Sequence, residues 1–583
     1  MVINGISNYK FLKFMPNILG IKYGGHDTSA AIMVKGKIIA ACAQERFSLD
    51  KHSRKFPIDA INECLKIAKI KIKDIDEIAF VNDLKSYIRE IYLKPAIKDD
   101  SRIQFMLNDV ERIKRAYNME SILREKLNFK GKIGFYRHHL CHVASAYYPS
   151  GFKNALCVSL DGVGEYETGI MVGAKNGKIK VLSSENVYPN SLGLVYSAIT
   201  FYLGWKHHCD EGIIMGLAPY GNSKNIVPGT KKTYKSFFNK IIKVKSDFKY
   251  EVNPEFMDYY NQRDKWVSDD FIKIFGKKRN FKDKITQHHK DIAAALQERL
   301  EEIVLKQLKK AKEKFKFKNL CLAGGVSLNC SMNGEILKKK IFDRIFVTPA
   351  SGDDGCAIGA CYLAYQKLRK RLLPKKNYNF YLGSRYSSTK IKKSILKSKS
   401  KYQIPSDLYN TTAKLLADGK IVAWFQNGAE FGPRALGNRS ILCRPYPVKM
   451  KDYLNSRVKF REEFRPFAPA VLEKFQKDYF EIEQNSPHML MACKVKKSKK
   501  NIIPAVVHVD DTCRVQTVNE NLNNKFNNLL EAFYNLTNIP VLLNTSFNVK
   551  GQPIVNTPEQ AINTFKNTNI DVLVIDNYIL AKK

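Results

Sequence analysis

The chain has 583 residues, of which 44% are hydrophobic and 11% aromatic. This length exceeds what one hydrophobic core supports, so we expect two or more domains, and the composition excludes a disordered or fibrous protein. The formal net charge is +41, which would suit a nucleic-acid partner. However, only 22 of the 97 basic residues are arginine and the lysines are spread along the chain, so we expect no nucleic-acid partner.

No apolar run approaches the roughly 18 residues that a membrane-spanning helix needs, and the first residues show no signal-peptide pattern. The 12 cysteines include no C-x-x-C pair, which argues against a zinc ribbon or a redox motif. We therefore expect reduced thiols and a cytoplasmic protein without a membrane span. The oligomeric state is left open, with a homo-oligomer among the alternatives.

The order of elements predicts an internal duplication. Residues 17–45 read as short strands joined by tight turns, and residues 57–70 and 100–128 have helical spacing of apolar residues. Residues 154–184 repeat the strand pattern of 17–45, and a long helix is predicted at 288–317. Two β-β-β units, each followed by helices, describe the duplicated fold of the actin-like ATPase class, whose nucleotide lies between the two halves.

A charged stretch with few apolar anchors, residues 371–405, is predicted to be a partly ordered linker. It would separate a first domain (1–370) from a second domain (406–583). The second domain opens with a helix and a strand and ends on the strands PVLLNTSF and VLVID. The whole chain is therefore predicted to be an α/β protein with two domains.

Four residues suggest a metal site. His138 and His142 are one helical turn apart, so their rings share a face. Asp161 follows a buried strand, and Asp353 lies in a glycine-rich turn before a predicted helix. Two imidazoles and two carboxylates favour iron, manganese or zinc over magnesium. Each residue taken alone could instead serve as a helix cap or a turn residue.

Two further turns could hold catalytic or phosphate-binding groups. Gly324 and Gly325 lie between a predicted strand and helix, a place that suits a nucleotide, although the Walker A and dinucleotide-binding patterns are absent. His26, in GGHDTSAA, is a candidate general base at the end of a strand. Lys51 and His52 follow in a basic segment that could equally be a solvated loop.

An arginine-rich segment indicates an anion site. Six arginines lie within 32 residues, between Gly, Pro and Phe rather than between polar residues. Buried guanidinium groups need anionic partners. Glu430, Glu462 and Glu463 are too few to neutralise them, so we expect a bound phosphate. The six are Arg434, Arg439, Arg444, Arg457, Arg461 and Arg465.

The motifs together resemble the NodU/TobZ/CmcH family of carbamoyltransferases, and the resemblance extends over nearly the whole chain. It rests on these strings, in order: GGHDTSAA, QERFSLDKH, HHLCHVASAYYP, DGVGEYET, MGLAPYG, LAGGVSLNC, PASGDDG, FGPRALGNRSIL, FRPFAP and LNTSFN. The resemblance implies a TsaD-like first domain of the actin-like ATPase superfamily, which transfers the carbamoyl group. It also implies a YrdC-like second domain, which forms carbamoyladenylate from carbamoyl phosphate and ATP.

The family's functional residues carry over onto matching positions of this sequence. They imply ferrous iron, or another divalent transition metal, held by His138, His142, Asp161 and Asp353, and ATP used together with Mg²⁺. They imply active-site roles for His26 and Lys51 and a nucleotide-binding turn at Gly324, Gly325 and Asn329. The residues implied to bind carbamoyl phosphate and the nucleotide phosphates are Arg434, Lys459, Arg465, Arg514, Asn544 and Ser546.

One departure concerns position 213, where the family usually has lysine and this chain has Ile213. We therefore expect an acceptor that differs from the better-known ones. The resemblance implies an ATP-dependent O-carbamoyltransferase acting on a hydroxyl of a small molecule or a carbohydrate. The alternatives are an actin-like superfamily kinase, a tRNA-modifying threonylcarbamoyl-type protein and a non-enzymatic nucleotide-binding scaffold.

Overall fold

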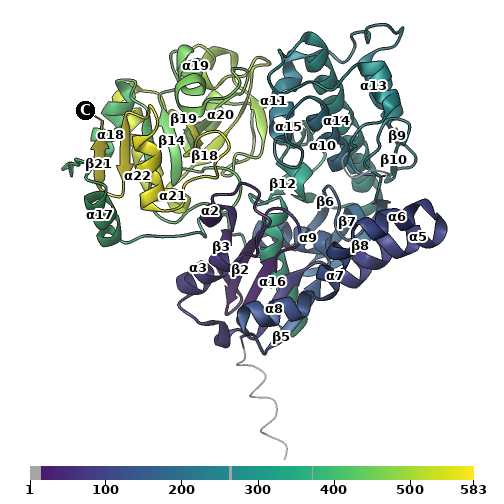
Figure 1. The fold of residues 1–583 in the computed structure, drawn as a ribbon. Coiled ribbons are helices and arrows are strands. Elements are labelled where there is room, and N and C mark those ends of the chain that lie inside the picture. Colours follow the sequence, from purple (N-terminus) through teal and green to yellow (C-terminus); the bar gives the residue numbers. More distant parts are fainter. Residues whose placement is uncertain (1–14, 261–264, 370–371, 583) are drawn as a thin grey trace, which may run out of the picture.

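The computed structural model describes residues 15–260, 265–369 and 372–582. Figure 1 shows the N-terminal strands in purple, a second body in blue to teal, and a C-terminal body in green to yellow. We refer to residues 15–369 as the N-terminal part and to residues 372–582 as the C-terminal part.

Two five-stranded sheets of the N-terminal part have the same topology. The first has the order β3-β2-β1-β4-β5, with β1 (Ile18–Lys22), β2 (Ser29–Val34), β3 (Lys37–Ala43), β4 (Glu77–Val81) and β5 (Lys132–Tyr136). The second has the order β8-β7-β6-β11-β12, with β6 (Asn154–Leu160), β7 (Glu167–Lys175), β8 (Lys178–Val187), β11 (Asn319–Ala323) and β12 (Arg344–Val347). In each sheet the first three strands are antiparallel and the last two pair in parallel. The predicted duplication and the actin-like fold class are therefore confirmed.

Two helices join the sheets. Helix α9 (His138–Ser150) packs on the second sheet, α16 (Cys356–Arg369) packs on the first, and the helices contact each other. A Cβ atom on Gly20 would lie 2.0 Å from the carbonyl oxygen of Ala357, and one on Gly359 would lie 1.8 Å from that of Cys141. Glycine is therefore required at both positions, because the backbones approach directly. This close packing fixes the start of each helix, where the candidate metal residues lie.

Helices also cover the remaining surfaces of the N-terminal part. Those beside the second sheet are α10 (Leu192–Tyr202), α11 (Glu211–Leu217), α14 (Gln287–Phe315) and α15 (Cys330–Lys338). The long predicted helix at 288–317 thus corresponds to α14. The other elements are α2 (Glu45–Ser48), α3 (Ile58–Ala68), α4 (Leu84–Ile88), α5 (Lys94–Lys98), α6 (Ser101–Asn108), α7 (Val110–Tyr117), α8 (Met119–Leu127), α12 (Tyr234–Ile241), α13 (Asp269–Phe275), β9 (Ile242–Val244) and β10 (Tyr250–Val252).

The C-terminal part is built on a mixed seven-stranded sheet. Its order is β18-β15-β19-β14-β13-β20-β21, with β18 (Gln516–Val518), β15 (Ala468–Leu472), β19 (Val541–Ser546), β14 (Arg439–Cys443), β13 (Val422–Phe425), β20 (Val572–Ile575) and β21 (Tyr578–Ala581). The mixed sheet confirms an α/β second body, and its YrdC-like character stays a prediction. The other elements are α17 (Ser388–Lys397), α18 (Leu408–Ala417), α19 (Lys449–Leu454), α20 (Gln476–Tyr479), α21 (Glu520–Thr537), α22 (Pro558–Lys566), β16 (Ala492–Lys494) and β17 (Thr512–Arg514).

The segment predicted as a linker contacts the N-terminal part and also the rest of the C-terminal part. The backbone N–H of Ala41 donates to Leu382 over 3.2 Å, and Tyr381 donates its hydroxyl to the Leu436 carbonyl over 2.9 Å. Helix α17 within this segment packs on α22. The domain boundaries at 370 and 406 stay predictions. Across the described ranges, none of the helices has the length and apolar character that crossing a bilayer demands.

Candidate active site

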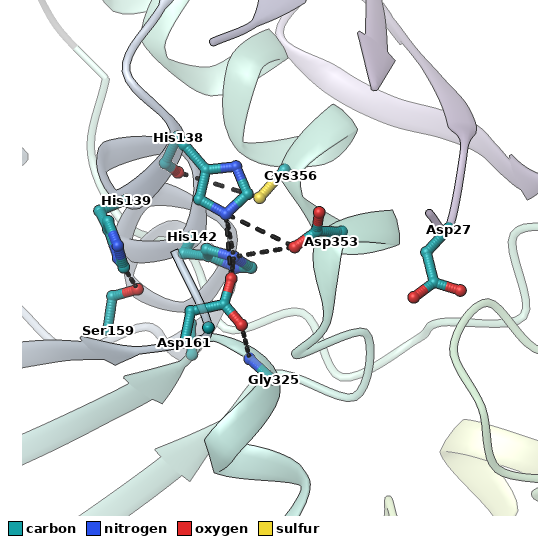
Figure 2. Close-up of polar contacts among 12 residues, drawn as sticks. Asp27, His138, His139, His142, Ser159, Asp161, Gly325, Asp353 and Cys356 are labelled. Carbon is teal, nitrogen blue, oxygen red and sulfur yellow. Dashed lines mark hydrogen bonds and ion pairs between the residues drawn. The ribbon is translucent and has the colours of Figure 1, made fainter. Parts of the chain in front are cut away.

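The four predicted metal residues lie together. Helix α9 begins at His138, so His138 and His142 occupy one face of its first turn. Asp161 follows β6 directly, and Asp353 opens a short turn (Asp353–Gly355) before α16. Figure 2 shows their side chains converging from these separate elements. We call these four residues the histidine–aspartate cluster.

The ligand atoms of the histidine–aspartate cluster are close enough to share one ion. Oδ2 of Asp161 lies 3.0 Å from Nε2 of His138 and 3.1 Å from Nε2 of His142, and the two nitrogens are 3.0 Å apart. Oδ1 of Asp353 lies 3.4 and 3.7 Å from the same nitrogens. Four lone-pair-bearing atoms in such proximity need shared protons or a cation among them. Two imidazoles and two carboxylates fit a divalent transition metal.

Residues around the cluster keep its carboxylates ionised. Burial alone would raise the pKa of Asp161, but hydrogen bonds with His138 and His142 bring it well below its usual range. Burial likewise opposes ionisation of Asp353, and the ammonium of Lys22, 3.1 Å from its Oδ2, lowers the pKa of that carboxyl. The N–H of Gly325 donates to Oδ1 of Asp161 over 3.0 Å. Charged carboxylates of this kind are ready to bind a cation.

Lys22 and Cys356 also lie at the histidine–aspartate cluster, although no sequence motif predicted them there. Lys22 ends the apolar strand β1 and is only 3% exposed. The one feature of the sequence that could have indicated its role is a single lysine at the end of the apolar run NILGIK. Cys356 begins α16, and its thiol completes an alternative three-ligand set with His138 and His142. Burial raises the pKa of Cys356 to about 11, so its thiol is protonated at neutral pH. The carboxylates of Asp161 and Asp353, in contrast, are already ionised.

His139, between the two cluster histidines in sequence, has a different role. Its Nδ1 lies 2.8 Å from the Ser159 hydroxyl (Figure 2), and its Nε2 lies 2.8 Å from the Glu167 carbonyl. Burial lowers the pKa of His139 to about 3. It is therefore a neutral structural residue that turns away from the cluster.

His26 lies in the turn after β1, and Lys51 lies in the segment after α2. Nδ1 of His26 lies 2.8 Å from Oδ2 of Asp27, and the other oxygen of Asp27 lies 2.7 Å from Nδ1 of His52. Burial opposes protonation of His26, but the hydrogen bond and charge of Asp27 raise its pKa to about 9. His26 is therefore an imidazolium at neutral pH, which does not favour its predicted role as a general base.

The glycine turn after β11 packs against the cluster. Gly324 has a φ of +87°, and a Cβ there would lie 2.1 Å from the Leu160 carbonyl oxygen. Asn329 caps α15 by accepting from the N–H of Met332 over 3.0 Å, and its amide exchanges hydrogen bonds with Gln297. Close packing and helix capping thus explain Gly324 and Asn329 locally, and the nucleotide-binding role of the turn stays a prediction.

Among the arginines of the C-terminal part, four group together. Burial and the charges of Arg514 and Arg465 lower the pKa of Arg434 to about 9. Burial and the same two neighbours lower that of Arg461. Mutual repulsion of this kind requires that the guanidinium groups lie close together. We call Arg434, Arg461, Arg465 and Arg514 the arginine cluster.

The nearby acids do not neutralise this cluster. Oε1 of Glu430 accepts from the backbone N–H groups of Leu436, Asn438 and Arg439, so it shapes the loop that carries Arg434. Glu462 lies 3.6 Å from Arg465. Among the described residues, neither Arg434 nor Arg514 has a carboxylate partner, and their Nε atoms are buried without a hydrogen bond.

Three arginines of the predicted segment lie elsewhere. Arg439 is fully buried and donates to backbone carbonyls, including those of Asn438 and Ser384. Arg444 donates to the Ala417 carbonyl at the end of α18. Arg457 is exposed beside the ring of Tyr453. Sequence alone could not separate these three from the arginine cluster, because all share Gly, Pro and aromatic neighbours.

Lys459, Asn544 and Ser546 lie beside the arginine cluster. Nζ of Lys459 donates to the Ser546 carbonyl over 2.7 Å and to Oδ1 of Asn548 over 2.8 Å. Burial lowers the pKa of Lys459, and the charges of Arg461 and Arg465 lower it further. Lys51 of the N-terminal part adds to this repulsion, so Lys51 lies near Lys459. Asn544 donates to Gln516 over 2.8 Å.

Ile213 lies on α11 and is 4% exposed, within the large apolar core. Its side chain therefore packs with hydrophobic neighbours. The expectation that it changes the choice of acceptor stays a prediction.

Two family comparisons cover most of the chain. The carbamoyltransferase N-terminus family matches residues 17–362, and the carbamoyltransferase C-terminus family matches residues 413–582. An uncharacterized protein of Synechocystis sp. is 36% identical over 97% of this chain and 97% of its own length. The nodulation protein NolNO of Sinorhizobium fredii is 35% identical over 96% of this chain and 79% of its own length.

Solved structures are more distant. Component A of (R)-2-hydroxyglutaryl-CoA dehydratase from Acidaminococcus fermentans covers 60% of this chain and 99% of its own, at 14% identity and a TM-score of 0.33. HypF of T. kodakarensis covers 62% of this chain and 49% of its own, at 15% identity and a TM-score of 0.31. The family matches and the full-length relatives confirm the resemblance seen in the motifs. The chain therefore belongs to the carbamoyltransferase family, and it is an enzyme that transfers carbamoyl groups.

Proposed function

We propose that this carbamoyltransferase is ATP-dependent and forms carbamoyladenylate from carbamoyl phosphate and ATP before transfer. The acceptor is a hydroxyl of a small molecule or a carbohydrate. The observation that carries the proposal is a pair of half-buried arginines, Arg434 and Arg514, whose buried Nε atoms make no hydrogen bond and which have no carboxylate partner among the described residues. Taking guanidinium groups out of water without a partner costs free energy, which a bound anion offsets.

The arginine cluster supports the activation step. A carbamoyl group is a poor electrophile, because the nitrogen lone pair feeds the carbonyl. Linking it to AMP gives a mixed anhydride and releases pyrophosphate, with Mg²⁺ accompanying ATP. Arg434, Arg465 and Arg514 would bind the phosphates by charge-assisted hydrogen bonds and stabilise the charge that develops as bonds break. Lys459, with Asn544 and Ser546, would complete this pocket.

The histidine–aspartate cluster supports the transfer step. His138, His142, Asp161 and Asp353 would hold ferrous iron or another divalent transition metal. Such an ion, when bound, supplies Lewis acidity toward a phosphate or carbonyl oxygen without redox chemistry. Lys22 holds Asp353 ionised, and the N–H of Gly325 orients Asp161. The adjacent glycine turn, with Gly324 and Asn329, would bind the nucleotide of the intermediate, and Lys51, which lies near Lys459, would contact its phosphate.

Pyrophosphate release without an acceptor tests this proposal. The protein, reconstituted anaerobically with Fe²⁺, is incubated with ATP and Mg²⁺ in the presence and absence of carbamoyl phosphate. We expect pyrophosphate only when carbamoyl phosphate is present. Release of ADP without AMP would instead indicate a kinase. Steeply salt-dependent binding of tRNA together with threonine-dependent turnover would indicate a tRNA-modifying protein, and no turnover would indicate a nucleotide-binding scaffold.

A further inference from the structure

A second imidazole lies on the ring of His26. His208, in the segment between α10 and α11, stacks on His26 with ring centroids 5.4 Å apart and planes inclined by 23°. This histidine belongs to the string KHHCDEG, to which the activation and transfer steps assign no role. The two rings come from segments 182 positions apart in the chain, so only the tertiary structure brings them together.

His208 is held firmly in place. Its backbone N–H donates to Oε1 of Glu211 over 2.6 Å, and its ring lies 5.3 Å from that of Trp266 and 4.9 Å from that of His207. Its φ is +56°, in the left-handed region that non-glycine residues rarely adopt. Surrounding contacts must therefore maintain a conformation that costs about 1 kcal/mol or more.

The same kind of backbone surrounds His26. Asp27 has a φ of +55° and His52 a φ of +56°, and the Asp27 carboxylate bridges the Nδ1 atoms of His26 and His52. Three non-glycine residues in left-handed conformations thus meet around one imidazole. Strained backbone is concentrated where a protein must position reactive groups. His26 and His208 are consequently a prearranged pair rather than two surface side chains.

Both rings keep nitrogen atoms available. Nδ1 of His26 is engaged by Asp27, whereas no described residue makes a hydrogen bond with its Nε2. The described residues likewise offer no hydrogen bond to the ring nitrogens of His208. The side chain of His26 is 32% exposed, so solvent reaches one side of the stack. With centroids 5.4 Å apart, one hydroxyl oxygen can come within hydrogen-bond reach of both rings.

We propose that His208 accepts the proton of the acceptor hydroxyl during carbamoyl transfer, while His26 donates a hydrogen bond to the departing phosphate. This inference rests on the proposed carbamoyladenylate intermediate. The acceptor oxygen forms a bond to the carbamoyl carbon, and the bond from that carbon to the AMP phosphate oxygen breaks. The phosphate oxygen keeps the electron pair, AMP leaves, and the hydroxyl proton moves to a nitrogen of His208. The products are a carbamate ester, AMP and one proton.

The charges around the two rings support this division of roles. Burial and the charges of His26 and His207 lower the pKa of His208 to about 3. Asp161 opposes this decrease and Arg54 adds to it. His208 is therefore neutral and keeps an unprotonated ring nitrogen beside the acceptor position, whereas the Asp27 carboxylate keeps His26 protonated and able to donate.

A comparison of hydroxylamine with water and glycerol as acceptors distinguishes loss of the general base from loss of the activation step. Hydroxylamine is a strong nucleophile that needs no general base, whereas water and glycerol need one. We expect His208→Ala to release pyrophosphate and to trap the carbamoyl group on hydroxylamine at rates close to wild type. We expect AMP formation in water and carbamoyl transfer to concentrated glycerol to fall about 100-fold. Added imidazole should restore part of this loss, which a purely structural role would not permit.

His208→Phe keeps an aromatic ring in the stack but removes both nitrogens, and Lys206→Gln, at the exposed position two residues earlier, serves as the control. We expect His208→Phe to behave like His208→Ala without imidazole, and Lys206→Gln to behave like wild type. Retained glycerol transfer in His208→Phe would overturn the proposal. So would parallel loss of hydroxylamine trapping, or absence of imidazole rescue in His208→Ala. If wild type releases no pyrophosphate, the two-step function fails. In that case the role of His208 is still tested by measuring, for each variant, transfer of the labelled carbamoyl group from carbamoyl phosphate to glycerol.

Discussion

The indole N–H of Trp205 donates to Oε1 of Glu462 over 3.2 Å. This contact joins the segment after α10 to the loop that carries Lys459 and Arg465. Glu462 also lies 3.6 Å from Nη1 of Arg465, and the Trp205 ring is covered by the guanidinium of Arg279 at 4.4 Å. The orientation of an arginine in the proposed phosphate pocket therefore depends on a residue of the N-terminal part.

Trp205→Phe should weaken carbamoyl phosphate binding. The ring remains, but Glu462 loses its donor, so its carboxylate is free to pair more closely with Arg465. One lost hydrogen bond corresponds to about 1 kcal/mol, and we expect a KM for carbamoyl phosphate about five-fold higher in the pyrophosphate assay. Glu462→Gln combined with Trp205→Phe should show non-additive effects. Glu463→Gln, an exposed neighbour, is the control, and additive effects would contradict the coupling.

Removal of one cluster histidine should abolish metal binding. We expect His138→Ala, reconstituted anaerobically with Fe²⁺, to contain less than about a tenth of the wild-type iron. The three remaining ligands would hold a metal far less tightly than four. His139→Gln should retain the metal, since the His139 ring faces Ser159 and Glu167. Elemental analysis of both proteins measures this difference. Equal metal content in the two variants would exclude His138 as a ligand.

Loss of an arginine from the proposed pocket should slow activation. We expect Arg514→Ala to reduce carbamoyl-phosphate-dependent pyrophosphate release about 100-fold, because a cation that stabilises developing phosphate charge is removed. Arg457→Ala, on the exposed surface beside Tyr453, should stay within about two-fold of wild type. A similar rate for both variants would show that Arg514 does not contact the phosphates.

Arg439 should be a stability residue. Its side chain is fully buried and donates to the carbonyls of Asn438 at 3.0 Å, Ser384 at 3.1 Å and Asn427 at 3.2 Å. Arg439→Met leaves these acceptors without a donor, and we expect a loss of about 3 kcal/mol in the free energy of unfolding. Urea titration measures it. An unchanged unfolding curve with lost pyrophosphate release would instead place Arg439 in the phosphate pocket.

The pair formed by His26 and Asp27 should make stability depend on pH. The folded pKa of His26 is raised to about 9, above the ordinary value of about 6.5. Its contribution is therefore fully present below about pH 6.5 and is lost as the pH rises through 9. We expect the free energy of unfolding of the wild type to decrease over this interval.

Asp27→Asn removes the carboxylate that holds the His26 proton. We expect a lower stability at pH 6.5 and a weaker decrease toward pH 9, measured by urea titration at a series of pH values. A decrease as steep as in wild type would show that other groups cause the pH dependence.

Local patterns predicted much of the fold. The repeated strand–turn–strand pattern at 17–45 and 154–184 predicted the two sheets, and helical spacing predicted α3 and α14. The same local logic placed His138 and His142 on one face. These features follow from contacts between residues close in sequence, and alternation and helical periodicity record them directly.

Other features could not be predicted from local sequence patterns. The ion pair of Lys22 with Asp353 and the stack of His26 on His208 join residues far apart in the chain. Arg434 and Arg439 share one motif, yet Arg434 lies beside Arg514, whereas Arg439 turns toward backbone carbonyls.

The sequence by itself determined the carbamoyltransferase family, the duplicated α/β fold and the residue types of both candidate sites. Only the tertiary structure decided which arginines lack a partner, which lysine balances Asp353, and which imidazole lies beside His26. The physical reason is that periodicity reports burial along one element, whereas charge compensation and ring stacking depend on distances between elements, which are set only when the sheets and helices pack.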